Sequence, residues 1–189
     1  MSADDLTFTA EPDAPVGEWI ARSEDAEWER LYAEQLPRVY NFFRYRIGRV
    51  ADAEDLTAVT FERAWRARQR YRRELAAFST WLMTIARHVA SNHLRSRRLH
   101  LEPIEAAHDV SAGTTPEDQV SRASDRRRLL KLLDRLPDRD RELVALKFGS
   151  ELSNQEIAAI TALSESNVGT ILHRVTQFLR AQWDAGERL

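Results

Sequence analysis

The chain has 189 residues, 43% of them hydrophobic and 31% charged, which is enough apolar material for one large core or two small ones. It has no cysteine, which excludes disulfides, thiolate metal sites and cysteine nucleophiles. The net charge is only −2, but acids crowd residues 1–30 and arginines crowd residues 63–98. This asymmetry indicates a polyanionic partner for the basic part, although solvated helix faces would give the same pattern.

The first residues predict neither a signal peptide nor a membrane anchor. Residues 1–26 hold Pro12, Pro15 and many acids, which is typical of a mobile tail with at most a short helix around Trp19. No apolar run approaches the ~20 residues that a membrane span requires. We therefore expect a cytoplasmic protein with no membrane insertion.

The next stretch predicts several helices. Apolar residues recur at helical spacing from 28 to 47, where Pro37 is expected to break or kink the segment into two helices and Gly48 to end it. Asp52 is the expected N-cap of a helix over 52–65, and a basic loop over 66–74 follows. A helix over 77–98 has one apolar stripe, while its other face is polar and basic.

The second half of the chain also predicts helices only. Residues 99–115 have few periodic apolar positions and are the expected linker. Four helices follow, over 116–136, 137–148, 154–161 and 165–180, with Ser153 and Ser164 as caps. The prediction is an all-α chain with an acidic tail (1–26), one domain over 27–99, a flexible linker over 100–115 and a second domain over 116–185.

Residues 152–175 fit a helix-turn-helix. A short helix, a tight turn at Ala162 and Leu163, and a longer helix from Glu165 carry apolar residues spaced for one shared core. An ordinary helical hairpin would show the same spacing. In a helix-turn-helix the second helix enters the DNA major groove, so small polar residues at its start would reach base edges and Arg174 would hold a phosphate. Ile171 is expected on the outward face, either touching a thymine methyl group or packing on a neighbouring helix.

Four motifs in order carry a family resemblance. The segments 52–67 and 78–95 resemble region 2 of the sigma-70 family in its extracytoplasmic-function (ECF) branch. The segments 136–144 and 152–174 resemble region 4 of the same family. Together they span about residue 28 to about residue 182, so the resemblance covers most of the chain. It implies an alternative sigma factor that binds core RNA polymerase and directs it to specific promoters.

The resemblance also implies which residues meet each partner. Major-groove contacts to the minus-thirty-five element would come from Glu165, Ser166, Asn167, Thr170, Ile171 and Arg174. Contacts to the minus-ten element would come from Arg70, Tyr71, Arg72, Arg73, Arg87, His88, Ser91, Arg95 and Arg98, with Tyr71 as a stacking platform and Trp81 in the core. The coiled coil of the largest polymerase subunit would meet Asp52, Glu54, Asp55, Leu56, Phe61 and Glu62, of which Leu56 and Phe61 are expected to lie mainly in the core. Family habit adds an anti-sigma protein as a further partner.

Two rival classes remain beside the sigma factor. An enzyme is not favoured, because no phosphate-binding loop, dinucleotide fingerprint or zinc-protease motif occurs. The five histidines form no ligand cluster in the sequence, so we expect no metal and no cofactor. A helix-turn-helix regulator that acts without polymerase is the alternative function, but the resemblance and basic face of residues 52–98 speak against it.

Overall fold

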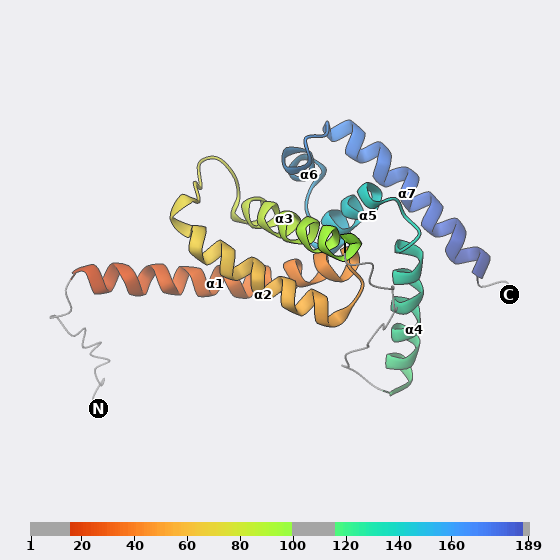
Figure 1. The fold of residues 1–189 in the computed structure, drawn as a ribbon, viewed down its shortest axis with the longest axis horizontal. Helices are drawn as coiled ribbons and strands as arrows, with labels where there is room; N and C mark the ends of the chain where they lie inside the picture. The colour runs from red at the N-terminus through yellow and green to blue at the C-terminus, as the bar shows by residue number, and fades with distance from the viewer. Residues whose placement is uncertain (1–15, 100–115, 187–189) are drawn as a thin grey trace, which may run out of the picture. The chain divides into compact units, whose positions relative to one another are not determined.

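The computed structural model describes residues 16–99 and 116–186 (Figure 1). The elements in chain order are α1 (Val16–Arg46), α2 (Val50–Ala67), the 3-10 turn η1 (Arg68–Arg70), α3 (Phe78–Leu99), α4 (Pro116–Leu133), α5 (Asp138–Val144), the π-helical turn η2 (Ala145–Gly149), α6 (Asn154–Thr161) and α7 (Glu165–Gly186). No strand occurs in the two described stretches, and the all-α prediction is confirmed. The expected linker over 100–115 lies outside the described residues.

The chain divides into two compact units, Met1–Glu34 and Gln35–Leu189. The second unit contains every residue discussed for function. Within it, residues 35–99 are called the N-terminal module and residues 116–186 the C-terminal module.

The course of α1 corrects two predictions. The helix begins at Val16, inside the segment expected to be a tail, and it continues through Pro37 to Arg46. Proline removes only one helical hydrogen bond, and Pro37 lies exposed, so its ring faces solvent. The turns that follow bury Val39, Phe42 and Phe43 completely, and this burial favours an unbroken helix. The helix stops where expected, because Gly48 adopts a left-handed φ of +94°.

Helices α2 and α3 pack side by side to form the core of the N-terminal module (Figure 1). Each buries one stripe: Leu56, Phe61 and Ala64 on α2, and Leu82, Ala86 and Val89 on α3. Thr57 and Thr60 are buried too, and their hydroxyls donate to backbone carbonyls one turn earlier at 2.6 and 2.7 Å. These hydrogen bonds offset the cost of removing the two hydroxyls from water, so they can lie inside an apolar core.

The helix-turn-helix forms in the C-terminal module as predicted. Ser153 and Glu156 make a reciprocal capping box at the start of α6, and the Ser164 hydroxyl accepts from the Asn167 amide at the start of α7. Between the helices, Ala162 takes the left-handed conformation with φ 57°. Ile157 and Val168 have no exposed surface, and Leu172 and Val175 are buried beside them. Helix α7 runs on past the predicted end at Arg180.

The turn η2 fits closely against α1 within the second unit. A Cβ added to Gly149 would lie 2.9 Å from the Asn41 carbonyl oxygen and 3.0 Å from the Phe42 nitrogen, so only glycine fits there. The buried Ser150 hydroxyl donates to the Arg38 carbonyl at 3.4 Å and lies 3.2 Å from the Met83 sulfur. The two modules are therefore in direct backbone contact in this structure.

Candidate nucleic-acid interface

The start of α7 presents the polar side chains expected of a recognition helix. Glu165, Ser166, Asn167 and Thr170 are all exposed on its first turns. Arg174, one turn further on, has a side chain that is 68% exposed. Its Nη2 donates to Asp140 of α5 at 3.0 Å, which holds the guanidinium at the edge of this surface. The helix-turn-helix core thus leaves one polar strip free for a groove of DNA.

Of the two alternatives predicted for Ile171, the structure favours packing within the protein, and it corrects the expected outward placement. Ile171 is only 7% exposed, so it packs inside the module and does not present its methyl groups to a groove. Gly169 lies against the start of α6, where an added Cβ would meet the Asn154 amide at an ordinary 3.5 Å. The predicted recognition surface therefore keeps its exposed members Glu165, Ser166, Asn167, Thr170 and Arg174.

A second polar surface follows α3. His88, Ser91, Arg95 and Arg98 are exposed along it, and Arg87 is half-buried. Arg87 donates from Nε to Glu142 of α5 at 3.0 Å and from Nη1 to the Ile160 carbonyl. Arg87, Ser91, Arg95 and Arg98 share one face because they are spaced by three or four residues, and His88 lies at the edge of this face.

The loop before α3 combines exposed cations with an aromatic cluster. Arg70, Arg72 and Arg73 are exposed, while Tyr71 is half-buried against Phe78 and Trp81, with ring centroids 5.5 and 5.2 Å away. The Tyr71 hydroxyl donates to the Ala76 carbonyl at 3.1 Å, which fixes the ring. Trp81 is half-buried, so this residue, expected in the core, shares its cluster with Tyr71. Fixed aromatic rings beside arginines suit unstacked bases and their phosphates.

The predicted polymerase residues on α2 fall into two groups. Glu54, Asp55 and Glu62 are exposed, and Glu62 pairs with Arg66 one turn on at 2.7 Å. Leu56 and Phe61 are buried at 8% and 5% exposure, so they belong to the core, as expected. Only the exposed acids are available to a basic partner.

Asp52 has a structural position that differs from the prediction. Helix α2 begins at Val50 with Arg49 as its N-cap, so Asp52 lies inside the first turn. Its side chain is 17% exposed, and its Oδ2 lies 3.6–3.7 Å from nitrogens of Arg49, His93 and Arg97. The carboxylate therefore ties the start of α2 to the end of α3.

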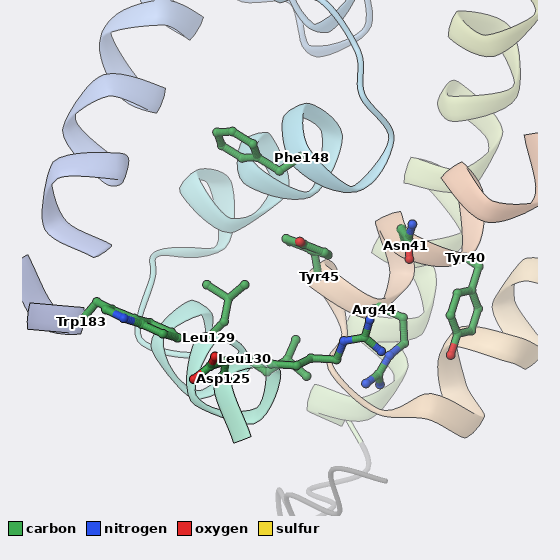
Figure 2. Close-up of a pocket in the computed structure, with 10 residues that line it drawn as sticks. Tyr40, Asn41, Arg44, Tyr45, Asp125, Leu129, Leu130, Phe148 and Trp183 are labelled. Carbon is green, nitrogen blue, oxygen red and sulfur yellow. The ribbon is translucent and has the colours of Figure 1, made fainter. Parts of the chain in front are cut away.

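A cavity of about 310 Å³ lies among α1, α4, η2 and α7 (Figure 2). Its lining mixes aromatic and apolar side chains, such as Tyr45 of α1, Phe148 of η2 and Trp183 of α7, with the charged Arg44 and Asp125. Phe148 is 51% exposed. Both modules contribute to this mixed pocket.

Sequence reasoning missed the acids of α5 that pair with Arg46 and with three of the arginines predicted to contact DNA. Arg46 Nη1 and Arg98 Nη2 both donate to Asp138, at 2.9 and 2.6 Å, and Glu142 and Asp140 accept from Arg87 and Arg174. The segment that contains these acids was predicted as a helix that resembles part of region 4, with no contact assigned to its acids. The pairing partners lie 34 to 92 residues apart, and no local pattern encodes such contacts.

Two family models match this chain in the same places as the two modules. The model of sigma-70 region 2 matches residues 31–100, and the model of sigma-70 region 4 matches residues 126–179. The RNA polymerase sigma factor CarQ of Myxococcus xanthus is 36% identical over 153 residues, which cover 81% of this chain and 87% of CarQ. This chain belongs to the sigma-70 family. Its relatives place it in the ECF branch of RNA polymerase sigma factors.

Other relatives and solved structures agree with this sigma-factor assignment. The ECF RNA polymerase sigma factor BldN of Streptomyces coelicolor is 34% identical over 79% of this chain, which spans only 58% of the length of BldN. The sigma factor RpoE from Bartonella quintana, solved with the anti-sigma factor NepR, superposes with a TM-score of 0.69 at 20% identity, covering 84% of this chain and 97% of RpoE. CnrH, solved with the cytosolic domain of CnrY, gives a TM-score of 0.62 at 22% identity over 89% and 94% of the two chains. At these identities the structures establish a shared fold.

Proposed function

We propose that this protein binds core RNA polymerase and directs it to specific promoters, as an alternative sigma factor. One observation carries the proposal. The arginine-bearing face of α3 lies on the module that matches region 2, and the exposed polar strip at the start of α7 lies on the module that matches region 4. The start of α7 would read the minus-thirty-five element in the major groove. The face of α3 and the preceding loop would melt and hold the minus-ten element.

The contacts to the polymerase come from the exposed acids of α2. Glu54, Asp55 and Glu62 offer three carboxylates to a basic partner, which the coiled coil of the largest polymerase subunit would supply. Leu56 and Phe61 support this surface from the core. A regulator that acts without polymerase would need no such acidic face, nor a second DNA surface on α3.

Run-off transcription tests the proposal. Purified bacterial core polymerase is incubated with this protein and fragmented DNA from its own organism, and the transcripts are sequenced. Discrete transcripts that require the protein support the proposal. An absence of transcripts, together with no stable complex with the core enzyme, favours a plain helix-turn-helix regulator.

A protein with this function acts in the cytoplasm, where the chromosome and polymerase are found. No helix in the described part of the chain is long and apolar enough to cross a membrane. We also propose an anti-sigma protein as a partner, since RpoE, which shares this fold, was solved with the anti-sigma factor NepR. Co-purification of the tagged chain from its native cell tests this, and recovery of core polymerase alone would contradict it.

A further inference from the structure

Two acids of α5 lie against the α3 face that the proposed function assigns to DNA. Asp138 and Glu142 are one helical turn apart, so their side chains lie on the same side of α5. Asp138 accepts from Arg98 and Glu142 accepts from Arg87, and these two arginines are proposed contacts of the minus-ten element. In this structure, therefore, carboxylates occupy the guanidinium groups that DNA phosphates would use.

Arg46 of α1 adds a buried donor to this arrangement. Its side chain is only 8% exposed, and its Nη1 donates to Asp138 at 2.9 Å. Its Nε is buried and has no hydrogen-bond partner. A buried guanidinium that keeps one donor unused is costly, so this donor remains available to a further acceptor.

A small polar cavity lies beside these groups. It measures about 130 Å³ and is bordered by Arg46, Ser91, Leu94, Arg95, Arg98 and Asp138. Three guanidinium groups and one hydroxyl around such a space form the donor set that proteins use for a phosphate group.

We propose that this cavity is a binding site for a backbone phosphate of promoter DNA, and that Asp138 and Glu142 substitute for phosphates until DNA displaces them. The inference rests on the proposed function, since the phosphate must come from DNA that lies along α3. It adds Arg46 to the DNA-binding residues and gives the acids of α5 a competing role.

The chemistry of the two anions explains how displacement would occur. Hydrogen bonds from Arg46 and Arg98 lower the pKa of Asp138, so the carboxylate remains ionised and competes as an anion. DNA presents many phosphates along α3 at once and releases counterions when arginines neutralise them. Asp138 has a side chain that is 51% exposed, so the competing pair lies where DNA can reach it.

Binding of a short fluorescein-labelled single-stranded oligodeoxynucleotide to the full chain tests the inference. The double variant Asp138→Asn with Glu142→Gln removes both competing charges and is expected to bind roughly fivefold more tightly than the wild type. Adding Arg46→Lys to the double variant keeps the buried positive charge but removes the guanidinium with its several fixed N–H donors. This change should abolish most of the gain in DNA affinity. Anisotropy at fixed ionic strength measures each affinity, and melting curves confirm that each variant is folded.

Glu151→Gln is the matched control. It removes another ion pair between the modules, the 3.3 Å contact with Arg38, but frees no arginine of α3. We expect its DNA affinity to equal that of the wild type. An equal gain for this control would mean that mere loosening of the modules exposes DNA surface, and it would overturn the phosphate substitution.

The run-off assay separates this inference from the proposed function. If the wild type supports transcription but the double variant shows no gain in DNA affinity, the inference alone is overturned. If the wild type supports no transcription, both fail. Transcription together with the gain, its loss with Arg46→Lys and an unchanged control supports both.

Discussion

Arginine supplies almost all of the positive charge in this chain, and the planar guanidinium group determines the geometry of its contacts. Lys131 and Lys147 are the only lysines. One guanidinium can bond two acceptors at fixed angles, as Arg87 does with Glu142 and the Ile160 carbonyl. A lysine at position 87 would keep the charge but lose this paired geometry.

Arg174→Ala should weaken promoter binding about equally for all sequences. The side chain is 68% exposed beside the recognition surface and would neutralise one phosphate. The negative slope of log affinity against log salt concentration should become shallower by about 0.9. Electrophoretic mobility shifts over a salt series measure this slope, with Lys131→Ala on α4 as the control. An unchanged slope for Arg174→Ala would contradict its role.

The pH dependence of stability should report the pairing of Asp138. The hydrogen bond from Arg46 lowers the pKa of this carboxyl in the folded state. The ionised form therefore stabilises the fold above the pKa of the unfolded chain, and this contribution is lost as the pH falls through the lowered folded value. Acidification below the usual carboxyl range should destabilise the wild type more than Asp138→Asn. Thermal unfolding of both proteins from neutral pH downward measures this, and parallel curves would contradict it.

Local signals predicted some residues well and others not at all. Ser153 and Ser164 cap their helices as expected, because a cap depends only on residues three positions away. Aspartate is a residue type that often caps helices, but the carboxylate of Asp52 instead faces His93 and Arg97, forty or more residues later. Helical spacing placed Ile171 outside, and only the packing of the module shows that it is buried.

At the scale of elements, periodicity predicted the helices, while tertiary contacts decided their exceptions. Pro37 is a local signal for a break, yet α1 continues because the next turns are buried. The turn η2 closes hydrogen bonds such as Ser150 amide to Ala145 carbonyl at 3.1 Å. This wider turn places Gly149 against α1. No sequence pattern within residues 138–149 predicts that contact.

Val168→Asp should unfold the helix-turn-helix. Val168 has no exposed surface, so aspartate there would bury an unpaired charge and cost about 4 kcal/mol or more. Gln177→Asp, at an exposed position of the same helix, is the control and should change stability by less than about 1 kcal/mol. Thermal unfolding followed by circular dichroism measures both. A native-like transition for Val168→Asp would show that this core is wrongly assigned.

At the scale of the whole molecule, the two modules differ from their mutual contact in how well they could be predicted. The family resemblance of each module could be predicted because its motifs lie within that module. Their contact could not, because partners such as Ser150 and the Arg38 carbonyl are 112 residues apart. Arg141 makes a second contact between the modules, because its Nε donates to the Tyr45 carbonyl at 2.9 Å. Its guanidinium also pairs with Asp134 of its own module at 2.7 Å, and burial lowers its pKa.

Gly149→Ala should weaken this contact between the modules. The added Cβ would lie 2.9 Å from the Asn41 carbonyl oxygen, and α1 backbone cannot rotate away as a side chain can. We expect a loss of about 1–3 kcal/mol in unfolding free energy. Gly169→Ala is the matched control, because its Cβ meets only the Asn154 amide at 3.5 Å, and it should be neutral or stabilising. Chemical denaturation measures both variants, and equal effects would contradict a tight fit at Gly149.

The pairing of α5 acids with arginines of both proposed DNA-binding surfaces has an evolutionary consequence. Asp138 bonds Arg46 and Arg98, Glu142 bonds Arg87, and Asp140 bonds Arg174. A lineage that changes one of these arginines leaves a carboxylate without its partner. Substitutions at 87, 98 and 174 are therefore expected to coincide with substitutions at 142, 138 and 140 among close relatives, so that changes in the proposed phosphate contacts are recorded in a helix outside both proposed DNA-binding surfaces.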